Sequence, residues 1–117
     1  SSDLGHIVSS VHNIAHHGDL SRSDQTKYVI AKNVVNSFND YVLEWDEKEI
    51  KTFINDKLIF SYPKNDQPWE RWPFDEKFHF ILNIAIGGNW GGMKGIDDTA
   101  FPTKMEIEHF KVYKKNT

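Results

Sequence analysis

Residues 77–88 read Lys-Phe-His-Phe-Ile-Leu-Asn-Ile-Ala-Ile-Gly-Gly, and this stretch decides the fold class. Every second position, starting at Phe78, is apolar, whereas the positions between them are mixed. Because successive side chains of a strand point to opposite faces, the pattern predicts a strand over 77–86 with one face in a core. The other face, which carries Asn83, is expected to meet something partly polar. The glycine pair ends the predicted strand.

The same two-residue period recurs along the rest of the chain. A hairpin is predicted from 50–54 and 58–62, because the short polar turn 55–57 joins two β-prone runs. The remaining predicted strands cover residues 7–16, 28–35, 41–46 and 105–113. All four prolines lie between these runs, where a missing N–H does not interrupt a ladder. Six or seven short strands and no amphipathic helix predict an all-β fold, an antiparallel β-sandwich.

Composition limits the class of protein further. With 117 residues the chain is one domain or part of one. A net charge of −3 gives no electrostatic footprint for nucleic acid, and no apolar run approaches the roughly 20 residues of a membrane helix. We therefore expect neither nucleic acid nor a membrane as a partner. The absence of cysteine excludes a disulfide framework and a thiolate nucleophile.

Carboxylates are the candidate catalytic groups, since 17 residues are acidic. Glu106 and Glu108 would share one strand face, roughly 6.6 to 7 Å apart along the backbone, and a retaining glycosidase needs carboxyl groups about 5 to 5.5 Å apart. The alternative, which we expect, is a solvated strand face. Asp97 and Asp98 follow a glycine-rich stretch and could bind a hard cation. We expect them instead to bond their own backbone in a turn.

Histidines cluster at His12, His16 and His17. On a helix the spacing of four would suit zinc, but Asn13 stands where H-E-x-x-H has its Glu. On a strand, His12 and His16 would lie about 13 Å apart, too far to share one ion. We therefore expect no metal there. The imidazoles either donate hydrogen bonds in a polar groove or lie on the surface at a strand end.

Tryptophans in loop-like sequence form a further signal. Trp69, Trp72 and Trp90 lie in Pro- and Gly-rich stretches, where an indole could stack on the apolar face of a pyranose ring. Asn83 or Asn89 could then take the sugar hydroxyls. The alternative is that each indole closes the end of the sandwich.

Residues 72–92 read W-P-F-D-E-K-F-H-F-I-L-N-I-A-I-G-G-N-W-G-G and strongly resemble glycoside hydrolase family 16, the laminarinase and β-glucanase family. That family typically reads W-P-F-D-x-P-F-[YH]-[LF]-[IL]-L-N-[LI]-A-[VI]-G-G-x-[WY]. Four other stretches resemble its motifs: 12–16 (H-G-T-V-H), 38–45 (F-H-x-Y-x-x-E-W), 50–57 (I-x-x-Y-V-D-G-x) and 101–113 (F-P…M-x-V-D-Y-V-R-V-Y). The motifs occur in the family's order, which makes the resemblance specific.

The resemblance implies that residues 1–117 are the C-terminal portion of a concanavalin A-like jelly-roll domain whose concave face holds a β-glucan chain. Members hydrolyse glucan with retention, using the two glutamates of E-x-D-x-x-E as nucleophile and acid/base. In the family that strand precedes the H-x-x-x-H segment, so the acid/base would fall near Ser2 and the nucleophile before the chain. We therefore expect no catalytic residue here, an inactive chain when alone, and the missing N-terminal half of the domain as its partner.

A literal copy of that motif occurs at Glu44, Asp46 and Glu49. It lies in the family's E-W segment, which has no catalytic role, and its charges suit an exposed turn. We do not expect it to act in catalysis.

Site residues follow position by position from the resemblance. His12 and His16 match positions that line the cleft, and Trp72 and Trp90 are candidate stacking or cleft-wall groups. With Asn83 and Asn89 they form the expected substrate-binding set.

Glu108 is the candidate metal ligand, because it matches an Asp that helps bind a structural calcium in many members. Glutamate is one methylene longer, and the other ligands would come from the missing N-terminal part. No cofactor is expected for hydrolysis.

The expected function is part of a secreted, extracellular or periplasmic, retaining endo-β-glucanase acting on β-1,3 or mixed-linked glucan. A non-catalytic β-glucan-recognition module on the same fold is the alternative, and a sandwich without a sugar ligand is a third. If the chain is part of a domain, a strand such as 77–86 lacks partners and exposes apolar side chains. We therefore expect that the chain does not fold independently.

Overall fold

The computed structural model describes residues 5–16, 25–31 and 34–116, and the side chains of His16 and Trp90 lie outside that description. The chain divides into two compact units, Ser1–Phe78 and His79–Thr117, which are described separately below. Within the described residues, no helix is both long enough and apolar enough to cross a bilayer.

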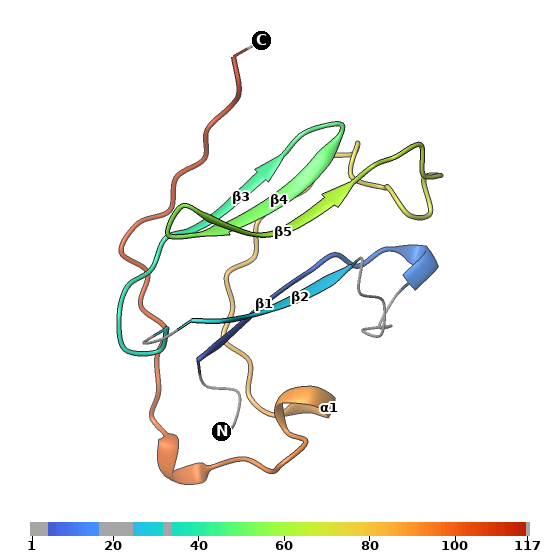
Figure 1. The fold of residues 1–117 in the computed structure, drawn as a ribbon. Helices are drawn as coiled ribbons and strands as arrows, with labels where there is room; N and C mark the ends of the chain where they lie inside the picture. The colour runs from blue at the N-terminus through green and yellow to red at the C-terminus, as the bar shows by residue number, and fades with distance from the viewer. Residues whose placement is uncertain (1–4, 17–24, 32–33, 117) are drawn as a thin grey trace. The chain divides into compact units, whose positions relative to one another are not determined.

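Unit 1 contains two antiparallel sheets (Figure 1). The first pairs β1 (His6–Ser10) with β2 (Thr26–Ile30), and the second has the order β3 (Tyr41–Trp45), β4 (Glu49–Ile54), β5 (Lys57–Pro63). A short 3-10 helix, η1 (Ile14–His16), follows β1. The predicted all-β class with antiparallel pairing is confirmed. The range predicted as a strand over 7–16 is shorter, because the chain leaves the sheet after Ser10.

The predicted hairpin is confirmed as β4 and β5. Asn55 and Asp56 connect the strands with φ of 47° and 67°. A two-residue type I′ turn requires this left-handed conformation at both positions. Asn and Asp are the side-chain-bearing residues that adopt this conformation most readily. The side-chain oxygen of Asn55 also accepts from the backbone N–H of Asp40, at 2.9 Å, and so fixes the turn to the start of β3.

The turn between β3 and β4 is exposed and held by Asp46. One oxygen of its carboxylate accepts from the backbone N–H of Lys48 at 2.8 Å and of Glu49 at 3.0 Å. Glu49 forms an ion pair with Lys51 along the strand. The acidic residues that copy the catalytic motif therefore serve a turn and a strand face, as expected.

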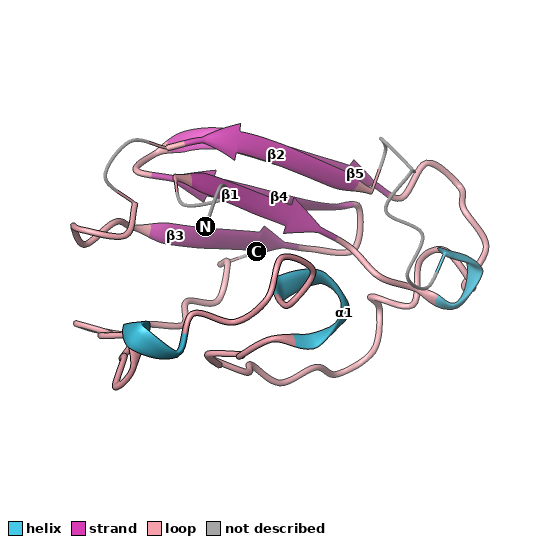
Figure 2. Cartoon of the chain, turned by 90° about the horizontal axis from the view of Figure 1, so that it is seen from below, coloured by secondary structure: helices cyan, strands magenta, loops and turns pink. Residues whose placement is uncertain are grey.

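The core of unit 1 lies between its two sheets, which form two layers (Figures 1 and 2). Its buried members are Val11, Ile50, Phe60, Tyr62 and Trp72, with Ile59 and Phe74 packed against them. One polar contact crosses the layers, where the hydroxyls of Ser9 on β1 and Thr52 on β4 lie 2.8 Å apart. Alternation along β5 explains the arrangement, since Phe60 and Tyr62 share one face of the strand.

Unit 2 contains two short helices, α1 (Gly88–Gly91) and η2 (Asp98–Ala100). The strands predicted over 77–86 and 105–113 are not formed, because the described residues give neither segment a ladder partner. The alternate apolar side chains from Phe78 to Ile86 are instead 50% to 60% exposed. The two segments meet at one point, where the rings of Phe80 and Phe110 contact edge to face with centroids 5.1 Å apart.

The strand predicted over 28–35 is displaced toward the N-terminus, to Thr26–Ile30. The observed strand β2 ends at Ile30. Part of the predicted range, residues 32–33, lies outside the described residues.

Candidate functional site

Trp72 is a core residue of unit 1, and its side chain is only 1% exposed. Its ring stacks on Tyr62 with centroids 5.7 Å apart and meets the edge of Phe74 at 5.3 Å. Its indole N–H donates to Asp75 at 3.3 Å. No open ring face is left for a sugar, so the structure corrects the expected stacking role and favours the alternative, in which the indole closes the core.

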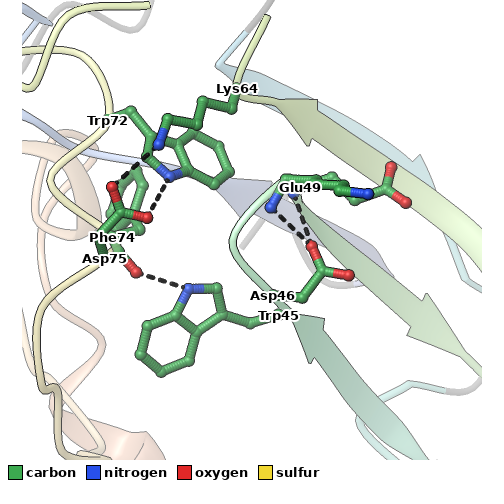
Figure 3. A network of polar contacts seen from close by, with 8 residues as sticks. Trp45, Asp46, Glu49, Lys64, Trp72, Phe74 and Asp75 are labelled. Atoms are coloured by element: carbon green, nitrogen blue, oxygen red, sulfur yellow. Dashed lines mark hydrogen bonds and ion pairs between the residues drawn. The ribbon is translucent and has the colours of Figure 1, made fainter. Parts of the chain in front are cut away.

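The segment that follows Trp72 is anchored by polar contacts at two points (Figure 3). Asp75 accepts from the ammonium group of Lys64 at 3.0 Å as well as from Trp72. The indole N–H of Trp45, at the end of β3, donates to the carbonyl of Phe74 at 2.9 Å. The Trp45 ring also meets the ring of Phe78 edge to face at 5.6 Å. These contacts fix the W-P-F-D segment within unit 1. The segment that carries Asn83 follows it in the sequence.

His12 lies in the loop between β1 and η1, with its side chain exposed. The hydroxyl of Ser10 lies 3.5 Å from its Nε2. The backbone of His16 lies in η1. His17 lies outside the described residues.

Asn13, the residue next to His12, is buried and was not predicted to matter. Its amide N–H₂ donates to the carbonyl of Arg71 at 2.9 Å and to the hydroxyl of Tyr62 at 3.4 Å. These bonds tie the histidine segment to the segment that begins at Trp72. The available signal was a carboxamide between the apolar Val11 and Ile14, a position where a polar side chain needs a buried partner.

The other expected sugar-binding residues belong to unit 2. Asn83 is exposed in an extended segment. Asn89 and Trp90 are consecutive residues of α1, and the Asn89 side chain is exposed. Gly87 and Gly88, with φ of +69° and +82°, turn the chain into this helix. The structure thus places Asn89 and Trp90 together in unit 2, and His12 and Trp72 in unit 1.

The candidate carboxylates Glu106, Glu108 and Asp97 all belong to unit 2. Glu106 and Glu108 are exposed on a segment that is not a strand, and Glu106 forms an ion pair with Lys104. Asp97 accepts from both the backbone N–H and the hydroxyl of Thr99, as expected for a turn. These hydrogen bonds favour the charged form and lower the pKa of Asp97 below its usual value.

The described residues contain no group of three or more histidine, aspartate or glutamate side chains that could hold a metal ion. Calcium takes six to eight oxygen ligands, and the resemblance assigns the others to the missing N-terminal part, so calcium binding by Glu108 stays a prediction.

Comparison with known proteins gives concordant matches. The family model for glycosyl hydrolases family 16 matches residues 2–110. A beta-glucanase of Rhodothermus marinus is 40% identical over 82 residues, which cover 66% of this chain and 29% of that protein. Two solved laminarinase structures each cover 84% of this chain and 41% of their own: one from Rhodothermus marinus (TM-score 0.77, 34% identity) and one from Flavobacterium sp. UMI-01 (0.76, 32%). The chain therefore spans well under half the length of these proteins.

Proposed function

This chain belongs to glycosyl hydrolases family 16, and on that basis we propose that it supplies part of the glucan-binding domain of an endo-β-glucanase acting on β-1,3 or mixed-linked glucan. The observation that carries the proposal is the match of family motifs, in order, together with 40% identity to a beta-glucanase. The fold is shared with two laminarinases at 32% and 34% identity, which supports a β-1,3-glucan as substrate.

Hydrolysis with retention requires a nucleophile and an acid/base carboxyl about 5 to 5.5 Å apart. Of the candidate carboxylates, Asp46 and Asp97 accept hydrogen bonds in turns and Glu106 forms an ion pair. Glu108 lies exposed in an extended segment. We assign the catalytic pair to the remainder of the domain, which is then the chain's necessary partner. The 117 residues alone are expected to be inactive.

Within the chain, exposed polar groups are assigned to the glucan. His12 offers an open imidazole, and Asn83 and Asn89 offer amides that can both donate to and accept from sugar hydroxyls. Trp90 is the proposed stacking residue, and His16 is assigned to the cleft from the family resemblance. Trp72 is buried and is not assigned to the glucan. Its indole packs in the core and donates to Asp75, in the segment that precedes Asn83.

The protein is proposed to be secreted, to the periplasm or the medium, since its substrate is a polysaccharide. No cofactor is assigned to hydrolysis. A structural calcium held by Glu108 stays a prediction, because its other ligands would come from the missing N-terminal part of the domain.

The direct test is hydrolysis of laminarin and lichenan by the full-length protein, with the anomer of the first product followed by proton NMR. Release of β-anomeric reducing sugar is expected. Failure to release sugar from laminarin, lichenan, carrageenan or agarose would overturn the enzyme assignment. Retained glucan binding without hydrolysis would instead establish the alternative recognition module.

Variants test the assigned residues. We expect Asn83→Ala and Trp90→Ala each to raise KM for laminarin by about tenfold, because each removes a stacking or hydrogen-bonding contact. Trp69→Ala is the matched control, since that indole is 62% exposed in unit 1 and has no assigned role. Equal effects of Trp69→Ala and Trp90→Ala would remove the basis for the stacking assignment.

A further inference from the structure

Unit 1 has a groove of about 570 Å³ beside β5 that the glucan assignment does not use. Residues of β5, Lys27 of β2 and the loop after β5 line it. Its volume falls within the usual range of small-molecule sites, about 300 to 1,000 Å³. Ile59 and Pro63 belong to its apolar part, and Asn65 and Gln67 to its polar part.

The loop that lines the groove is held in place by hydrogen bonds, of which those of the Tyr62 hydroxyl are partly buried. The amide N–H₂ of Gln67 donates to the carbonyl of Pro63 at 2.7 Å. The Tyr62 hydroxyl lies 3.2 Å from both the side-chain oxygen of Gln67 and the carbonyl of Arg71, which it can reach as a donor. Asn13 holds the same Arg71 carbonyl. A wall fixed in this way costs little further ordering when a ligand binds.

The charge of the groove differs from that of the chain. Among the described residues, Lys27 and Arg71 both line it and no acidic side chain does, although the chain as a whole carries a net charge of −3. The acids of the same loop, Asp66 and Glu70, are not lining residues. Lys27 is exposed, and the structure shows it no ion-pair partner among the described residues. Its charge is therefore available to a ligand.

This combination selects one chemical class. Arginine binds planar or tetrahedral anions through two parallel N–H bonds, and lysine adds a point charge. Carboxamides can satisfy hydroxyl groups, and the apolar part can receive the C–H face of a ring. We propose that the groove binds an acidic sugar unit, with Lys27 and Arg71 holding its carboxylate or sulfate group. This site is separate from the glucan-binding assignment, because the two share no residue.

The proposal can be tested on the full-length protein by ligand-observed saturation-transfer NMR. The probes are glucuronate, glucose 6-sulfate, neutral glucose and inorganic sulfate. We expect glucuronate or glucose 6-sulfate, or both, to bind at least about tenfold tighter than glucose and than inorganic sulfate, since both a charge and a ring are needed. The tighter of the two identifies the anionic group.

Variants distinguish binding in the groove from non-specific electrostatic attraction of the anion. Lys27→Gln is expected to weaken binding of the preferred acidic sugar by about tenfold, whereas Lys57→Gln, the same charge change at an exposed β5 residue outside the groove, should change it less than about twofold. Arg71→Lys keeps the charge but loses the paired N–H bonds, and should weaken binding too.

Three results would overturn the proposal. One is no detectable binding of either acidic sugar, as would follow if another part of the protein filled the groove. The second is equal binding of glucose or of inorganic sulfate. The third is an equal loss in Lys27→Gln and Lys57→Gln. None of these depends on laminarin hydrolysis, so failure here and failure of the proposed function are distinguishable.

Discussion

The hairpin of β4 and β5 and the segment 78–86 carry the same alternating apolar pattern but have opposite structural outcomes. In the hairpin, Ile50, Phe60 and Tyr62 are buried against Trp72. In 78–86, the apolar face is 50% to 60% exposed and unpaired. The difference is the partner: β4 has a strand on each side, and the described residues supply none to 78–86. The alternating apolar pattern therefore predicts which face of a segment is buried in a core. The segment forms a strand only when a neighbouring strand pairs with it.

The largest expected effect lies in the buried half of this comparison. Trp72→Ala removes a side chain that fills the core of unit 1 and should lower the free energy of unfolding of the full-length protein by about 3 to 5 kcal/mol. Trp69→Ala, at an indole that is 62% exposed, should stay within about 0.5 kcal/mol. Denaturant unfolding measures both. Equal losses would mean that Trp72 is not the core residue described here.

A smaller loss is expected where the histidine segment meets the core. Tyr62→Phe removes the hydroxyl that contacts Asn13, Gln67 and the Arg71 carbonyl. Because these polar groups lose a partner, we expect the free energy of unfolding to fall by about 1 to 3 kcal/mol. Tyr113→Phe is the control, since that side chain is 83% exposed. An unchanged stability in Tyr62→Phe would show that water satisfies these groups.

These contacts mark how far the sequence could predict the structure. Period-two patterns and the Asn55-Asp56 turn were sufficient for the hairpin, because both signals are local. The role of Asn13 could not be predicted, since its partners lie 49 and 58 residues away in sequence. The role of Trp72 was ambiguous for the same reason. An indole in a loop can stack on a sugar or close a core, and the residues packed around it determine which of the two it does.

The candidate site was predicted less completely than the fold. The family resemblance indicated His12, and the strand pattern and the nearby loop indoles indicated Asn83 and Asn89; the structure leaves all three side chains exposed. The groove at Lys27 and Arg71 was not predicted, because its residues come from β2 and from the loop after β5. No motif or spacing connects two such segments.

A weaker effect is expected at the anchor of the segment that leads to 78–86. Asp75→Asn removes the negative charge that pairs with Lys64 and weakens acceptance from the Trp72 indole. The pair is partly exposed, so we expect a loss of only about 0.2 to 1 kcal/mol, smaller still at high salt. Asp66→Asn in the neighbouring loop provides the matched charge change. A loss above that of Tyr62→Phe would contradict this ranking.

The smallest effect concerns local order in the exposed half. Hydrogen bonds from Thr99 lower the folded-state pKa of Asp97, so their contribution to stability is present above the unfolded-state pKa and is lost as pH falls through the folded one. Thr99→Val should move the Asp97 pKa back toward its usual value. Carboxyl-carbon NMR titration measures it, with Asp98 as internal reference. An unshifted Asp97 in the parent protein would refute the described turn.

The central claim is that 78–86 and 105–113 need neighbours which the described residues do not supply, and amide hydrogen exchange tests it most directly. In the 117-residue chain, we expect amides of β4 to exchange slowly and those of 79–86 and 106–113 to exchange at unprotected rates. In the full-length protein, both segments should become protected. Equal protection of 79–86 and β4 in the 117-residue chain, with cooperative unfolding of a monomer, would contradict the account.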